Sequence, residues 1–155
     1  MAGRLTVHSL VRGPWELRLA RADALTSTAE GLVLRVGGWP LAGDRPSTDV
    51  DGHEAVVRTA RLRSSIRSLR GHGTASAATR RDASPLGADV VVPYLDHPLA
   101  AGEWVAALVE LSGSPAPSTR DAFVSLDALD GATTVTATWP DGLVTKSRLA
   151  DPGAA

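Results

Sequence analysis

The sequence predicts an all-β fold, an antiparallel β-sandwich of about nine or ten strands. Short runs in which apolar and polar residues alternate recur every ~8 to 15 residues, which is the pattern of half-buried strands. Clusters of glycine and proline separate these runs, as turns between antiparallel strands require. A chain of 155 residues buries roughly 70% of the surface that its unfolded form exposes. We therefore expect one sandwich domain over residues 1–150 and a frayed tail over residues 151–155.

The first element is a predicted β-hairpin between Arg4 and Arg21. Apolar residues alternate with polar ones from Leu5 to Val11, and a second alternating run begins at Trp15. The pair Gly13-Pro14 between them cannot continue a central strand, because proline lacks the backbone donor and glycine favours a turn. We therefore expect two antiparallel strands joined by a tight turn.

The next part of the chain predicts a third strand over residues 32–36, followed by the longest ordered loop over residues 41–52. Glycine, proline, serine, threonine and aspartate are concentrated in that loop. Residues 55–70 fit two patterns, since some apolar residues fall at helical spacing while others alternate. We favour strands there because Val56 and Val57 are β-branched and the neighbouring segments are all β.

The central region predicts a loop or hairpin tip over residues 74–85 and a strand over residues 88–95. Pro93 and the turn-forming sequence of residues 96–98 are expected to end that strand. The run from Trp104 to Leu111 is apolar on both faces, so it is expected to lie centrally in a sandwich or under another domain.

Three further strands are predicted near the C-terminus, over residues 122–126, 133–139 and 143–149. In the second of them, valine, alanine and tryptophan share one face and threonines share the other. Pro140-Asp141-Gly142 supplies the turn into the last strand.

Composition excludes several classes of site. The chain has no cysteine, so it has no disulfide, thiolate metal site or cysteine nucleophile. The formal net charge of −1 gives no reason to expect a nucleic-acid partner. No apolar run approaches the ~20 residues of a membrane span, and the N-terminus lacks a secretory signal pattern. We expect a cytoplasmic protein with no membrane association.

No residue pattern predicts a catalytic, metal or cofactor site. The sequence has no Gly-x-Ser-x-Gly nucleophile motif. Glu103 and Glu110 are separated by an odd number of positions in one expected strand, so they face opposite sides and cannot form a glycosidase pair. The acidic cluster between Asp49 and Glu54 lacks the remaining ligands of a calcium loop. We therefore expect no cofactor.

The candidate ligand-binding residues are Trp39 and an arginine stripe formed by Arg61, Arg63 and Arg67. A tryptophan can stack on a sugar ring, and Trp39 stands beside a proline at a loop entrance. If residues 55–70 are strands, the three arginines project from one sheet face and are suited to binding carboxylates. The alternative for the arginines is a solvated face, and the other three tryptophans are expected to be core residues.

A family resemblance extends over about residues 3–149. It is carried by the segments GRLTVHSLVRGPWELRLARADAL and AEGLVLRVGGWPLAGD, and by the order of strands through residues 62–113. These resemble the C-terminal β-domain of an uncharacterised bacterial family known only as a domain of unknown function. Members of that family are similar in architecture to heparinase II/III-like polysaccharide lyases, which combine an α/α toroid with a β-sandwich.

The resemblance implies a non-catalytic accessory domain of a carbohydrate-active-like protein. Lyase chemistry in such proteins lies mainly in the toroid or at its interface, so no catalytic residue transfers to this chain. The implied partners are a helical toroid domain or a second copy of the chain. The alternatives are a stand-alone carbohydrate-binding module for acidic glycans and, third, a polysaccharide lyase-like enzyme. Whether the chain is a truncated or split gene product is left open.

Overall fold

The computed structural model describes residues 5–22, 32–43, 46–70, 76–83, 89–99, 102–113, 121–129 and 131–150, which form thirteen strands and no helix. The predicted all-β antiparallel sandwich class is confirmed, with more strands than the nine or ten expected. We expected one domain over residues 1–150, and the chain divides into two compact units, Met1–Ala116 and Pro117–Ala155. The tail over residues 151–155 lies outside the described residues. No helix suited to crossing a membrane is found in the described part of the chain.

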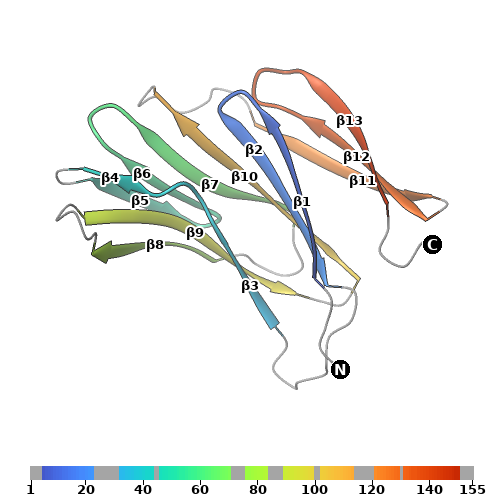
Figure 1. Ribbon diagram of the computed structural model, residues 1–155, viewed down its shortest axis with the longest axis horizontal. Helices are drawn as coiled ribbons and strands as arrows, with labels where there is room; N and C mark the ends of the chain where they lie inside the picture. Colours follow the sequence, from blue (N-terminus) through green and yellow to red (C-terminus); the bar gives the residue numbers. More distant parts are fainter. Residues whose placement is uncertain are drawn as a thin grey trace. The chain divides into compact units, whose positions relative to one another are not determined.

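The larger sheet of the first unit has six strands, and all of its neighbouring pairs are antiparallel (Figure 1). In spatial order they are β1 (Leu5–Arg12), β2 (Trp15–Ala22), β10 (Trp104–Ser112), β7 (Arg63–Arg70), β6 (Glu54–Arg58) and β5 (Ser47–Asp51). The expected strands within residues 55–70 are confirmed as β6 and β7. The run with two apolar faces, β10, is central, and every side chain from Val105 to Glu110 is buried.

The predicted N-terminal hairpin is confirmed, with Arg12 paired to Trp15 across a two-residue turn. Gly13 has a φ of 56°, in the left-handed region where glycine is favoured. Proline holds φ near about −65°, so the two central residues cannot both have positive φ as a type I′ turn requires. Glycine first and proline second fits a type II′ turn, whose twist suits a two-residue hairpin.

The second sheet of this unit is built around β9 (Asp89–Leu99). On one side β9 pairs with β8 (Ser76–Ala83), and on the other it pairs with β3 (Leu32–Gly37) and β4 (Leu41–Ala42). Figure 1 shows β3, β9 and β8 as the second layer beside the six-stranded sheet.

The expected end of a strand near residues 93–98 is wrong, because β9 runs through both prolines to Leu99. Gly38 N donates to the Pro93 carbonyl. The backbone nitrogen and carbonyl of Pro93 therefore point toward the gap between the end of β3 and the start of β4. Pro98 lies five residues later and therefore faces the other side, past Ser76, where the described part of β8 ends. Neither proline removes a hydrogen bond from a paired neighbour.

Two expected loops also contain strands. Part of the loop expected over residues 41–52 is β4 and β5, and part of the loop expected over residues 74–85 is β8. All five residues of β5 are exposed, and β5 and β8 each pair with one strand among the described residues. Backbone pairing, and not an apolar face, holds such edge strands in the sheet. Their polar sequences show no alternation of apolar and polar residues from which a strand could be predicted.

The core of the first unit lies between its two sheets. One cluster of buried side chains joins β6, β7 and β10 to β9 and consists of Ala55, Ile66, Leu95, Ala107 and Val109. Two partly buried residues pack against it, Val36 from β3 and Ala77 from β8. A second cluster joins Leu41 and Val91 to Val57. Gly38 lies close to both layers, because an added Cβ would lie 2.9 Å from Pro93 Cγ in its own sheet and 3.6 Å from Ile66 Cβ in the six-stranded sheet.

The second unit contains one three-stranded meander, β11 (Phe123–Leu129), β12 (Ala132–Thr138) and β13 (Val144–Ala150). The predicted faces of β12 are confirmed, since Val135 and Ala137 are buried. Trp139 is also buried as expected, and its indole Nε1 donates to Thr145 Oγ1 at 2.8 Å. Gly142, with a φ of 88°, completes the predicted turn.

Candidate functional site

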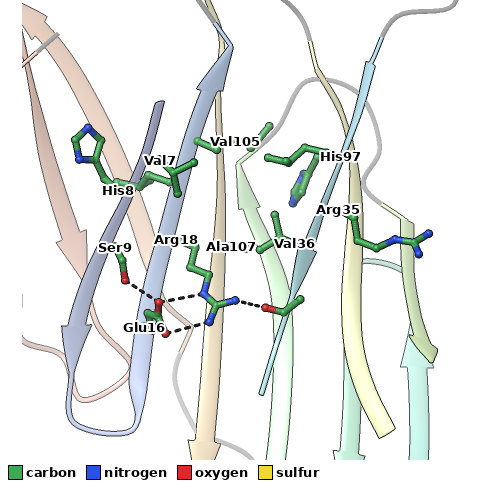
Figure 2. Close-up of a pocket in the computed structure, with 14 residues that line it drawn as sticks. Val7, His8, Ser9, Glu16, Arg18, Arg35, Val36, His97, Val105 and Ala107 are labelled. Atoms are coloured by element: carbon green, nitrogen blue, oxygen red, sulfur yellow. Dashed lines mark hydrogen bonds and ion pairs between the residues drawn. The ribbon is translucent and has the colours of Figure 1, made fainter. Parts of the chain in front are cut away.

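A cavity of about 340 Å³ opens between the two sheets of the first unit. Strands β1, β2 and β10 form one wall, and β3 and β9 form the other (Figure 2). Two of the residues that line the first wall are small, Ala20 on β2 and Ala107 on β10. Val7 and Ser9 line it from β1 and are exposed, so the cavity opens toward that edge strand.

An ion pair lies in the first wall. Arg18 Nε donates to Glu16 Oε1 at 3.1 Å, and its NH2 group donates to Glu16 Oε2 at 3.2 Å. The remaining NH1 group of Arg18 donates across the two layers to the Gly37 carbonyl. Ser9 Oγ donates to Glu16 Oε1 at 2.7 Å, as Figure 2 shows. The Arg18 hydrogen bonds hold the pKa of Glu16 below its ordinary value, although burial opposes the shift.

The opposite wall holds a buried histidine, His97. It lies on β9 across from Leu34, on the same face as Leu95, and its side chain is fully buried. Within the described residues, neither its Nδ1 nor its Nε2 has a hydrogen-bond partner. The His97 side chain, which carries both of these nitrogens, lines the cavity.

Burial lowers the pKa of His97, because the interior disfavours the charged imidazolium. The neighbouring carboxylate of Asp96 opposes this shift, and the charge of His53 adds to it. His97 is therefore a neutral imidazole at neutral pH, with one nitrogen that donates and one that accepts.

A second ion pair lies beside the cavity on the outer face of β3 and β9. Arg35 donates twice to Asp96, at 2.9 and 3.0 Å, and its guanidinium lies 4.1 Å from the ring centre of Tyr94. The hydrogen bonds from Arg35 lower the pKa of Asp96. This arrangement keeps the guanidinium and the carboxylate paired with each other.

The four predicted ligand-binding residues do not form one site. Arg63 is buried on β7, and its NH1 and NH2 groups contact Glu110 at 2.5 Å and Glu54 at 3.2 Å. Arg67 shares the strand face of Arg63 and is half-buried, while Arg61 is exposed in the turn before β7.

Trp39 is 44% exposed, and its carbonyl accepts from Ser64 Oγ, a neighbour of Arg63 that faces the other side of β7. The centre of the Trp39 ring lies 5.8 Å from the guanidinium of Arg18, a residue of the cavity wall. Ligand binding by Trp39 and the arginine stripe stays a prediction.

Sequence reasoning missed the cavity residues Glu16, Arg18 and His97. Glu16 and Arg18 alternate with Leu17 and Leu19 in the second predicted strand, so the sequence places them on its solvent-facing side, where charged residues are ordinary. His97 was assigned to a turn with its neighbouring proline. Its inward position follows only when β9 is continued through Pro93, because residues 91, 93, 95 and 97 then share the buried face.

Neither the family models, nor the curated proteins, nor the solved structures contain a significant match to this chain. The fold and site define a class only, an antiparallel β-sandwich with a ligand-sized cavity between its sheets. Among the described residues, no group of three or more histidine and acidic side chains is placed to hold a metal ion.

His97 predicts a pH dependence of stability. Its pKa in the folded chain is lower than about 6.5, the ordinary value, so below that pH the unfolded chain binds a proton that the folded chain does not. The free energy of unfolding should fall by up to about 1.4 kcal/mol per pH unit as pH decreases from about 6.5 to the folded-state pKa. Urea unfolding at a series of pH values between about 5 and 7.5 measures it.

The comparison for this prediction is between two histidine variants. His97→Leu should remove this contribution, whereas His53→Gln, at an exposed position, should retain most of it, because burial of His97 is the largest cause of the lowered pKa and the charge of His53 is a smaller one. Equal pH dependence in the wild type and His97→Leu would show that His97 does not titrate as described.

Proposed function

We propose that this chain is a non-catalytic β-sandwich binding module whose first unit takes a small organic molecule into the cavity between its sheets. The observation that carries the proposal is His97, a buried imidazole that lines the cavity with both nitrogens unsatisfied. Leaving a buried polar group unpaired costs about 1–3 kcal/mol per group, which a bound molecule can recover. The cavity volume of about 340 Å³ is within the range of ligand pockets.

The polar groups of the cavity support binding rather than catalysis. Both oxygens of Glu16 accept hydrogen bonds from Arg18, and the lowered pKa keeps this carboxylate ionised and paired. The desolvated His97 makes no hydrogen bond to a hydroxyl or carboxylate of the described residues, whereas a catalytic base is usually oriented by such a contact.

A second candidate is the accessory domain that docks onto a helical domain or a second copy of the chain. One observation favours it: β1 pairs on only one side among the described residues and carries exposed apolar side chains. Val7 is 61% exposed and Val11 is 72% exposed. An edge strand with an apolar row is suited to adding a strand or face from a partner.

The acidic-glycan module is the weaker alternative. Arg63 is already paired with two carboxylates, and Trp39 interacts with the opposite side of the sheet from Arg63. Calorimetric titration with a uronate oligosaccharide tests it, and millimolar or tighter binding that Arg61→Gln abolishes would favour it over the cavity.

The cavity proposal is tested by titration with prodan, a neutral naphthalene dye whose emission shifts to the blue in an apolar site. We expect saturable binding to the wild type and at least about tenfold weaker binding to Ala20→Leu, because the added side chain fills the cavity. Ala42→Leu, at an exposed alanine of β4, is the matched control and should bind like the wild type. Binding that Ala20→Leu leaves unchanged, or no saturable binding up to about 1 mM, would contradict the proposal.

A further inference from the structure

The charges that face the cavity cancel one another. Arg18 is held by both oxygens of Glu16, and Arg35 beside the cavity is held by both oxygens of Asp96. His97, which also lines the cavity, is neutral at neutral pH because it is desolvated. An ionic head group that entered the cavity would lose water without finding a free counter-ion, which is unfavourable.

The unsatisfied imidazole sets a second requirement. A neutral imidazole has one nitrogen that donates and one that accepts, and within the described residues both lack partners. A hydroxyl or carboxamide group both donates and accepts, so it can pair with either nitrogen in either tautomer. A purely apolar molecule would leave both nitrogens unpaired.

The remaining lining is apolar and extends between β1 and β3. Leu34 and Val36 line the wall formed by β3 and β9, and Val7, Ala20, Val105 and Ala107 line the wall formed by β1, β2 and β10. This lining provides contact area for a hydrocarbon or aromatic body, while the His97 imidazole lies on the β9 side.

From this arrangement we infer that the cavity is a site for an uncharged organic molecule with an apolar body and a hydroxyl or carboxamide head group bound by His97. This inference rests on the proposed binding function and names the ligand class. Two lining residues, His8 and His97, have buried nitrogens without a partner among the described residues. Figure 2 shows the His8 ring on the far side of β1, pointing away from the cavity, so His97 is the specificity-determining residue.

Three naphthalene probes of one shape test the ligand class by displacement of prodan: 2-naphthalenemethanol, 2-methylnaphthalene and 2-naphthoate. In the wild type we expect the alcohol to bind at least about tenfold more tightly than either the methyl compound or the carboxylate. In His97→Leu the alcohol and the methyl compound should bind within about twofold of each other. His97→Gln, whose amide also donates and accepts, should restore the preference for the alcohol.

The outcomes distinguish failure of the inferred ligand class from failure of the proposed binding function. Equal binding of the alcohol and the methyl compound to the wild type would overturn the inference and leave the cavity proposal intact. Tightest binding of the carboxylate would overturn it in favour of an acidic ligand. Failure of prodan and all three probes to bind would reject both. The wild-type comparison decides the ligand class even if a His97 variant does not fold.

Discussion

Arg63→Met is expected to lower the free energy of unfolding by about 3–5 kcal/mol, because it removes one partner of a buried ion pair. Arg63 NH1 and Glu110 Oε1 lie 2.5 Å apart, and the two side chains are 5% and 6% exposed. Without Arg63 the Glu110 carboxylate keeps the hydrogen bond from Trp15 Nε1 at 2.6 Å but loses its buried counter-ion. An uncompensated charge in the interior is far less favourable than either a complete pair or no charge.

Urea unfolding of single and double variants measures this effect. The double variant Arg63→Met with Glu110→Leu should recover most of the loss, because it removes both charges together. Arg61→Met is the control, since Arg61 is exposed in the preceding turn and its change should stay within about 0.5 kcal/mol. A loss at Arg63 no larger than the loss at Arg61 would mean that the pair is not buried in solution.

The placement of Arg63 shows what strand alternation leaves out about a charged residue. Strand alternation correctly put Arg63 and Arg67 on one face of β7. It does not show which side chains the neighbouring strands of the same sheet place next to them. Glu110 comes from β10, 47 residues away in the chain, and Glu54 comes from β6. Arg63 is therefore paired with two carboxylates of its own sheet, and ligand binding by it stays a prediction.

The parts of the fold that sequence predicted well are those in which one face is buried and the turn chemistry is local. The β12–β13 hairpin meets both conditions, with Val135 and Ala137 buried on β12 and Asp141-Gly142 in the turn. The β1–β2 hairpin meets only the second condition, through Gly13-Pro14, because the alternating apolar residues of β1 are exposed. Period-two alternation identifies the buried face only where one face is buried, whereas turn residues define the connection in both hairpins.

The errors concentrate in the second sheet, where the deciding factor is what lies beside each backbone. Pro93 and Pro98 were interpreted as strand ends, yet each faces a place where no described neighbouring strand needs its donor. Prediction of the cavity would likewise require knowing which strands lie beside one another. Arg18, Gly37 and His97 come from β2, β3 and β9, and only the packing of the two sheets brings them to one place.

Ile66→Ala is expected to lower the free energy of unfolding by about 2–5 kcal/mol, because it removes a fully buried side chain from the core between the two sheets. Ile66 belongs to the cluster that joins β6, β7 and β10 to Leu95 on β9, and its Cβ is also 3.6 Å from the Cβ position that would be built on Gly38. Backbone on both sides limits how far the site can collapse, which favours the upper part of that range. Leu62→Ala is the matched control at a side chain that is 40% exposed, and its loss should be well below that of Ile66→Ala. Urea unfolding with an unchanged denaturant slope measures both losses, and equal values would show that β7 does not bury Ile66 against β9.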